Sequence, residues 1–110
     1  MSDHAIIDAE ISIIPIGSSS GTSMSKEVAA AFDAIKKIED IRSTSLTPMG
    51  TQIEANTINS ILRAVEAAHQ AVKSSGAKRI VSIIHIDERL DEPKSMEDKV
   101  ESVKQKLSKQ

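Results

Sequence analysis

The sequence contains no cysteine, tryptophan or tyrosine, and Phe32 is its one aromatic residue. Without cysteine the chain has no disulfide, no thiol nucleophile and no thiolate metal site. The shortage of aromatic rings disfavours a stacking platform for single-stranded nucleic acid. A net charge of −2, with no basic cluster, argues against binding a duplex through its phosphates. The core must therefore be built from aliphatic residues, and we expect no nucleic-acid partner.

Long hydrophobic runs are absent as well. No apolar stretch approaches the roughly 18 residues that suggest a membrane-spanning helix. The N-terminal sequence MSDHAIIDAE has no basic segment followed by an apolar one, as a signal peptide would have. We therefore expect a cytoplasmic protein that does not enter the membrane. A length of 110 residues is typical of one domain, so residues 1–110 are expected to form a single unit.

The hydrophobic pattern predicts four strands and three helices. The expected strands are residues 5–16, 41–46, 51–55 and 79–87. The first helix is expected from Ser25 to about Glu39, capped by Ser23 or Ser25. Asn56 or Thr57 should cap the second helix, which should end at Gly76. Ser95, with Asp98 as its capping-box partner, should open the third.

This order of elements, β-α-β-β-α-β followed by a last helix, is the pattern of an α+β ferredoxin-like fold. We expect an antiparallel sheet in the order 4-1-3-2, with the first two helices on one face. Their apolar stripes support this arrangement. The stripes are Val28, Ala31, Phe32, Ile35 and Ile38 in the first helix, and Ile58, Ile61, Leu62, Val65, Ala68 and Val72 in the second. The opposite face of the sheet is then open.

A carboxylate in the middle of a predicted strand raises a question. The hairpin segment LTPMGTQIEA, residues 46–55, places Glu54 on the open face, because Ile53 and Ala55 point toward the helices. Glu10 shares that face on the neighbouring strand, within one or two residue pairs. Like charges across a ladder repel each other, so a basic side chain such as Arg42 or Arg79, a proton or a bound cation should offset them.

Apolar residues are also expected on surfaces that would be exposed to water in a monomer. Ile14 and Ile16 share the open face with Glu10. The last helix carries a narrow stripe of Met96, Val100, Val103 and Leu107. Exposed apolar patches of this kind usually mark an interface. We therefore expect a homo-oligomer, with a tetramer as the predicted assembly.

The chain resembles the small thiamine-binding proteins, which are single-domain relatives of the YkoF-type thiamine/hydroxymethylpyrimidine-binding proteins. The segments that carry the resemblance are AEISIIPIG, SKEVA, LTPMGTQIEA, GAKRIVSIIHIDER and MEDKVESV. The resemblance covers nearly the whole chain, and the hairpin that ends in Glu54 is its most specific part. It implies a ferredoxin-like fold, sheet-to-sheet dimers that form tetramers, and binding of thiamine or its hydroxymethylpyrimidine moiety without chemistry.

The candidate ligand residues lie on the open face and around the hairpin, and we expect the ligand to be held there at a sheet-to-sheet interface between subunits. They are Glu10, Ser12, Thr47, Met49, Thr51, Glu54 and His85. No catalytic residue, cofactor or metal site is predicted, since three scattered histidines have no metal-ligand spacing and GSSSGTS lacks the Lys-Ser/Thr of a phosphate loop. Two alternatives stay open: a structural or regulatory module with no ligand, and an enzyme that uses Glu10 and Glu54 as an acid-base pair.

Overall fold

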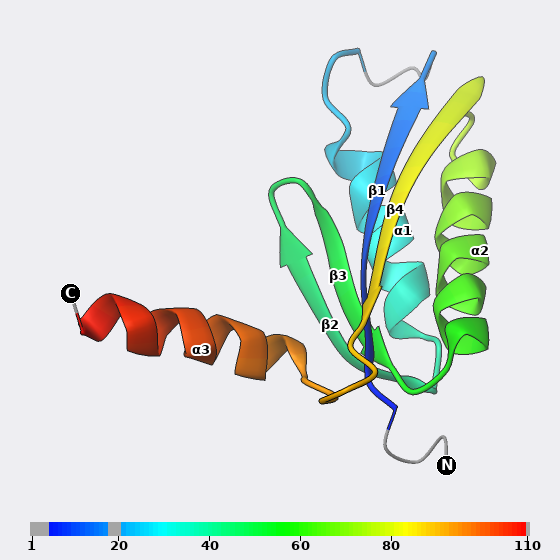
Figure 1. Ribbon diagram of the computed structural model, residues 1–110. Coiled ribbons are helices and arrows are strands. Elements are labelled where there is room, and N and C mark those ends of the chain that lie inside the picture. The colour runs from blue at the N-terminus through cyan, green and yellow to red at the C-terminus, as the bar shows by residue number, and fades with distance from the viewer. Residues whose placement is uncertain (1–4, 18–20, 110) are drawn as a thin grey trace.

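The computed structural model describes residues 5–17 and 21–109, and it confirms the ferredoxin-like order of elements (Figure 1). The strands are β1 (Ile7–Ile16), β2 (Ile41–Thr47), β3 (Gly50–Ala55) and β4 (Arg79–Glu88). The helices are α1 (Ser25–Lys36), α2 (Ile58–Ser74) and α3 (Met96–Ser108). The strands form one antiparallel sheet in the order β2-β3-β1-β4, which is the predicted 4-1-3-2 order read from the other edge.

The core lies between the sheet and the layer formed by α1 and α2. Alternate residues of β1 point into it, as the strand pattern predicted. The buried apolar residues are Ile7, Ala9, Ile11 and Ile13 from β1, Ile53 and Ala55 from β3, Ala31 and Ile35 from α1, and Ile61, Ala64, Ala68 and Val72 from α2. The core therefore closes with aliphatic residues and contains no aromatic side chain.

The helix ends agree with the predicted signals in two of three helices. Thr57 caps α2, because its Oγ1 accepts a hydrogen bond of 3.1 Å from the amide of Ser60. Gly76, with a φ of 95°, ends that helix in the left-handed conformation that glycine adopts at low cost. Helix α1 differs. Its N-cap is Met24, which makes no side-chain cap bond, and the helix ends at Lys36 rather than near Glu39.

The hairpin between β2 and β3 is present and tightly built. Thr47 donates a hydrogen bond of 2.7 Å from Oγ1 to the carbonyl oxygen of Gly50. A Cβ at Gly50 would lie 2.9 Å from the carbonyl oxygen of Ile11 on β1. Only glycine allows β3 to approach β1 this closely at the hairpin, so Gly50 sets the position of the hairpin against the sheet.

Two predicted core positions on α2 are exposed. Ile58 and Leu62 are 42% and 52% accessible, because the buried side of the helix is formed by Ser60, Ile61, Ala64, Ala68 and Val72. Their assignment to the core stripe was therefore wrong.

The open face of the sheet has an apolar half. Ile14 is half-buried there, and Ile16, Val81 and Ile83 are exposed. Ile14 lies directly opposite Val81 across β1 and β4, whereas Ile16 lies opposite Arg79 and Ile83 opposite Ser12. We call Ile14, Ile16, Val81 and Ile83 the apolar half of the open face.

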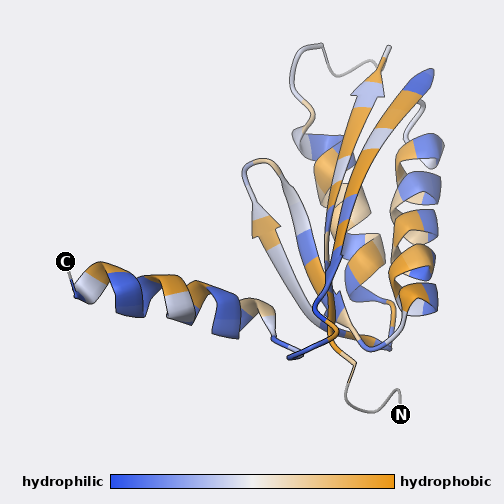
Figure 2. Cartoon of the chain, in the orientation of Figure 1, coloured by the Kyte–Doolittle hydropathy of each residue, from blue (hydrophilic) through white to orange (hydrophobic). Residues whose placement is uncertain are grey.

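Helix α3 projects away from the sheet and from the layer of α1 and α2 (Figure 1). Its capping box is formed as predicted, with Ser95 Oγ accepting from the amide of Asp98 and the Asp98 carboxylate accepting from the amide of Ser95. None of its residues is buried. Hydrophobic residues run along one side of the helix (Figure 2), and Val100, Val103 and Leu107 are more than half exposed.

Candidate functional site

Acidic side chains gather at the end of the open face opposite the apolar half. The antiparallel pairing places Asp8 of β1 between Glu54 of β3 and Asp87 of β4. Glu10 follows two residues later on the same face of β1. Strand alternation therefore brings four carboxylates to one corner of the sheet. Such a cluster needs compensating charge or hydrogen-bond donors.

A pocket of about 260 Å³ opens at this corner. We call it the carboxylate pocket. Its floor comes from the sheet and its wall from the first turns of α3. The residues that line it are Asp8, Ala9, Glu10, Gln52, His85 and Asp87 of the sheet, and Met96, Lys99 and Val100 of α3.

Asp8 is the buried group at the centre of the pocket. Its residue is only 8% exposed. Oδ2 accepts a hydrogen bond from the ammonium of Lys99, whereas Oδ1 is buried and accepts no hydrogen bond from any described residue. Burial raises the pKa of the Asp8 carboxyl, and the neighbouring charge of Glu54 adds to this, although Lys99 opposes both. Asp8 therefore has an unmet demand for a donor or a positive charge.

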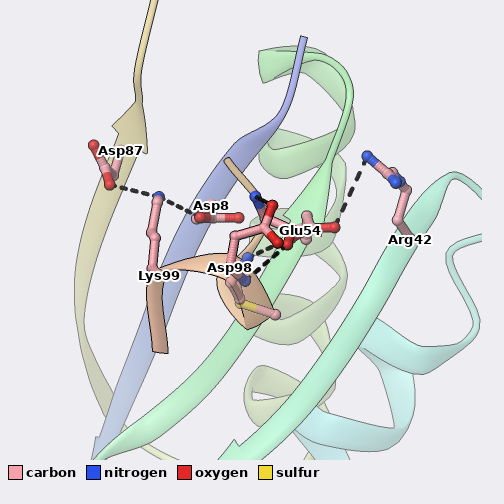
Figure 3. Close-up of polar contacts among 8 residues, drawn as sticks. Asp8, Arg42, Glu54, Asp87, Asp98 and Lys99 are labelled. Atoms are coloured by element: carbon pink, nitrogen blue, oxygen red, sulfur yellow. Dashed lines mark hydrogen bonds and ion pairs between the residues drawn. The ribbon is translucent and has the colours of Figure 1, made fainter. Parts of the chain in front are cut away.

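Lys99 connects α3 to two strands. Its Nζ donates to Oδ2 of Asp8 and, at 2.7 Å, to Oδ2 of Asp87 (Figure 3). Desolvation lowers the pKa of the Lys99 ammonium, but the hydrogen bonds to the two aspartates outweigh it and raise the pKa above its ordinary value. Lys99 is therefore a cation at neutral pH. Its ionic bridge would be lost when the pH rises through that raised pKa, or when the two aspartates are protonated at low pH.

Glu54 has two partners: Arg42, which the sequence suggested, and the start of α3, which it did not. It is 5% exposed, and its Oε1 accepts a hydrogen bond of 2.7 Å from the backbone amide of Met96, at the start of α3 (Figure 3). Its Oε2 lies 3.8 Å from Nη1 of Arg42. A carboxylate at a helix N-terminus satisfies a free amide and favours the helix dipole. Glu54 therefore holds α3 and does not line the pocket.

Of the two arginines proposed to offset the acidic cluster, Arg42 reaches it and Arg79 does not. Arg79 pairs with Ile16 at the far end of β1. The ladder between β2 and β3 has a bulge between Ile41 and Ser43, at the position of Arg42. The next residue, Ser43, pairs with Glu54.

Glu10 faces the pocket between two polar neighbours. It accepts a hydrogen bond of 3.1 Å from Nε2 of Gln52, and its Oε1 lies 3.9 Å from Nδ1 of His85. The predicted closeness of Glu10 and Glu54 is present as a diagonal relationship, because Glu10 is directly opposite Gln52 and Glu54 is directly opposite Asp8. His85 shares the face of Glu10, as its strand parity predicted, and its side chain is 75% exposed.

The other predicted ligand residues lie elsewhere. Ser12, Thr47, Met49 and Thr51 line a separate apolar cleft of about 70 Å³ between the hairpin and α1. Thr51 points into the helix layer and is buried, whereas Met49 at the turn is exposed. The candidate residues therefore divide between two places, with Glu10 and His85 at the carboxylate pocket.

The residues of the corner that were missed from the sequence include Asp8, Gln52, Asp87, Met96 and Lys99. Asp8 and Asp87 could have been found, since they share strand parity with Glu10 and His85. Met96 and Lys99 could not, because the path of the connector before α3 sets their position. Among the described residues, no group of three His, Asp or Glu side chains is placed to hold a metal ion. In that same part of the chain, no helix is long and apolar enough to cross a membrane.

Comparison with known sequences gives a consistent family. Residues 9–104 match the sequence profile of a family described as thiamine-binding protein. A UPF0045 protein of Methanothermobacter thermautotrophicus is 43% identical over 102 residues, which cover 93% of this chain and all of that protein. The UPF0045 protein YqgV of Bacillus subtilis is 35% identical over 90% of this chain and 95% of its own length.

Comparison with solved structures agrees. A hypothetical protein of Methanocaldococcus jannaschii superposes with a TM-score of 0.79 at 37% identity, over 89% of this chain and 95% of that one. A Thermotoga maritima protein, assigned provisionally to thiamine biosynthesis or salvage, superposes with a TM-score of 0.72 at 19% identity, over 89% of this chain and 98% of that one. At 19% identity the second likeness concerns the fold alone.

Proposed function

This chain belongs to the thiamine-binding protein family, and we propose that it binds thiamine or its hydroxymethylpyrimidine moiety in the carboxylate pocket without catalysing a reaction. The pocket's volume of about 260 Å³ is close to the roughly 300 Å³ at which small-molecule sites begin. The hairpin cleft, at about 70 Å³, is much smaller.

The buried Asp8 carboxylate is the observation that carries this proposal. Its Oδ1 lacks a hydrogen bond among the described residues, and its ionised form is disfavoured by burial. The exocyclic amine of an aminopyrimidine can donate to such an oxygen, and a thiazolium supplies a positive charge to the surrounding carboxylates. Glu10 and Asp87 lie on either side of Asp8. They would accept hydrogen bonds from the same ligand or attract its positive charge.

The hairpin residues have a secondary place in this proposal. Ser12, Thr47, Met49 and Thr51 line the hairpin cleft, so they would contact a ligand only if it occupied that cleft. Glu54 would act indirectly, because it fixes the start of the helix that walls the carboxylate pocket.

The apolar half of the open face supports the proposed homo-oligomer, with a tetramer as the expected form. Ile16 and Ile83 are 46% and 49% exposed beside Val81 on one continuous surface. A second copy that covered this surface would remove it from water, at roughly 25 cal/mol for each Å² of apolar area. A second copy bound to the apolar half would also reach the edge of the carboxylate pocket, because the apolar half and the pocket lie on the same face of the sheet.

Calorimetry with thiamine and with hydroxymethylpyrimidine tests the proposal. Asp8→Asn removes the buried charge and keeps the shape. Loss of a hydrogen bond to a charged group costs about 1.5–3 kcal/mol, which is roughly a 10- to 150-fold weaker Kd. The matched control, Glu66→Gln, removes an exposed carboxylate from α2 and should bind as the wild type does. Equal affinity in Asp8→Asn and wild type would reject this pocket as the site.

A second candidate function rests on the exposed apolar surface. If the chain is a structural or regulatory module, the apolar half and the stripe of α3 are its interfaces, and the carboxylates only anchor α3. Absence of binding for both ligands, together with a stable oligomer, would favour this alternative.

A further inference from the structure

Helix α3 forms one wall of the carboxylate pocket but is attached to the sheet at only a few points. Met96, Lys99 and Val100 line the pocket from the helix side. The hydrogen bonds that join α3 to the sheet in the described residues come from its first turn: the Met96 amide to Glu54, and the Lys99 ammonium to Asp8 and Asp87. All three acceptors are carboxylates.

The packing of α3 on the sheet is loose. No residue of the helix is buried. A second hollow, of about 370 Å³, separates its other side from Ser43 and Ser45 of β2. Every residue of the connector before it, 89–93, is exposed. Within a single chain, apolar packing therefore contributes little to holding α3, and the hydrogen bonds and ion pairs of its first turn carry most of the attachment.

We infer that α3 is a hinged wall of the ligand pocket and that Lys99 is the positioning residue that holds it. Docking of α3 on the sheet and occupation of the pocket by a ligand stabilise each other. This inference rests on the proposed function for the identity of the ligand. A ligand between α3 and the sheet would cover the apolar surfaces of Met96 and Val100, which face the pocket beside the carboxylates. It would therefore favour the docked position of the helix, and coupling of this kind is reciprocal.

Hydrogen exchange reports docking directly. A helix of 13 residues in isolation is marginal in water, so α3 should lose amide protection when it leaves the sheet. Without ligand, Lys99→Met should lower protection across residues 96–108, because the bridge to Asp8 and Asp87 is gone. Lys99→Arg keeps the charge and the donors and should retain protection. Lys106→Met, which removes an exposed lysine from the last turn of the same helix, is the matched control.

Thiamine is the probe for the coupling. It should raise the protection of α3 in the wild type, and its Kd should be weaker in Lys99→Met than in Lys106→Met by roughly tenfold, within the usual range of coupling between sites. Equal protection of α3 in the unliganded Lys99→Met and Lys106→Met variants would overturn the role of Lys99. Thiamine binding that is unchanged or tighter in Lys99→Met, or that lowers α3 protection, would overturn the coupling.

A wild type that binds neither thiamine nor hydroxymethylpyrimidine would reject the proposed function and the coupling together. The measurement without ligand would then still decide whether Lys99 holds α3, so the two failures are distinguishable.

Discussion

Glu54 and Met96 are 42 residues apart in sequence and are joined by a hydrogen bond of 2.7 Å from the Met96 amide to the Glu54 carboxylate. This contact explains a carboxylate in the middle of a sheet. Glu54 is buried because it supplies the acceptor that the first turn of α3 needs, with Arg42 at 3.8 Å on its other side.

Glu54→Gln should lower the pKa of Asp8. The charge of Glu54 helps to raise that pKa, and the substitution removes this charge while keeping an acceptor for the Met96 amide. Titration of the Asp8 side chain by NMR in both proteins is the measurement. An Asp8 pKa that does not move would mean that Glu54 has no electrostatic influence on it.

Asp8→Asn should raise the melting temperature at pH 7. The pKa of the Asp8 carboxyl in the folded chain lies above its ordinary value of 3.8. Such a carboxyl stabilises the fold at a pH below 3.8, and this stabilisation is lost as the pH rises through the pKa of the folded state. The asparagine mimics the neutral form, so the two melting temperatures should converge near pH 3. Thermal unfolding from pH 3 to pH 7 tests this. A variant that is less stable than the wild type at pH 7 would contradict it.

The same substitution separates binding from folding. Asp8→Asn is expected to weaken ligand binding while it stabilises the chain, as happens where a site keeps a destabilising group for its function. Loss of binding in this variant therefore would not come from unfolding.

Ile83→Lys should reduce the size of the oligomer. The substitution places a charge in the apolar half of the open face, where Ile83 is 49% exposed in the single chain. Leu90→Lys, at an 83% exposed position in the connector before α3, is the control and should leave the assembly intact. Light scattering distinguishes the outcomes against the monomer mass of 11.8 kDa. A wild type that is already monomeric at micromolar concentration would remove the basis of the proposed tetramer.

Gly50→Ala should destabilise the chain by roughly 1–3 kcal/mol, the usual cost of forcing atoms into a packed position. The new Cβ would lie 2.9 Å from the carbonyl oxygen of Ile11, and backbone cannot yield as a flexible side chain can. Denaturant unfolding measures the change. An unaltered free energy of unfolding would show that β1 and β3 can separate at the hairpin without cost.

The fold could be predicted because its signals are local and agree with one another. Alternation in β1 identified the buried face, Thr57 and Gly76 marked the ends of α2, and the turn at residues 48–49 marked the hairpin. The same parity argument placed Glu10, Glu54 and His85 on the open face. Ile58 and Leu62 were misplaced because the buried side of α2 runs along Ile61, Ala64, Ala68 and Val72 and does not extend to them.

The candidate site was only partly predictable, since it depends on where α3 lies. The capping box at Ser95 predicted the start of that helix but not its direction. Lys99 looked like an ordinary charged residue on a helix surface, and its link to Asp8 crosses 91 positions of sequence. No local pattern encodes a contact of that kind.

Mapping of thiamine by NMR tests the central claim most directly. In a titration of the isotope-labelled protein, the largest chemical-shift changes should come from Asp8, Glu10, His85 and Asp87 on the sheet and from Lys99 on α3, which surround the carboxylate pocket. Changes concentrated at Thr47, Met49 and Thr51 would place the ligand in the hairpin cleft instead and would contradict the proposed site.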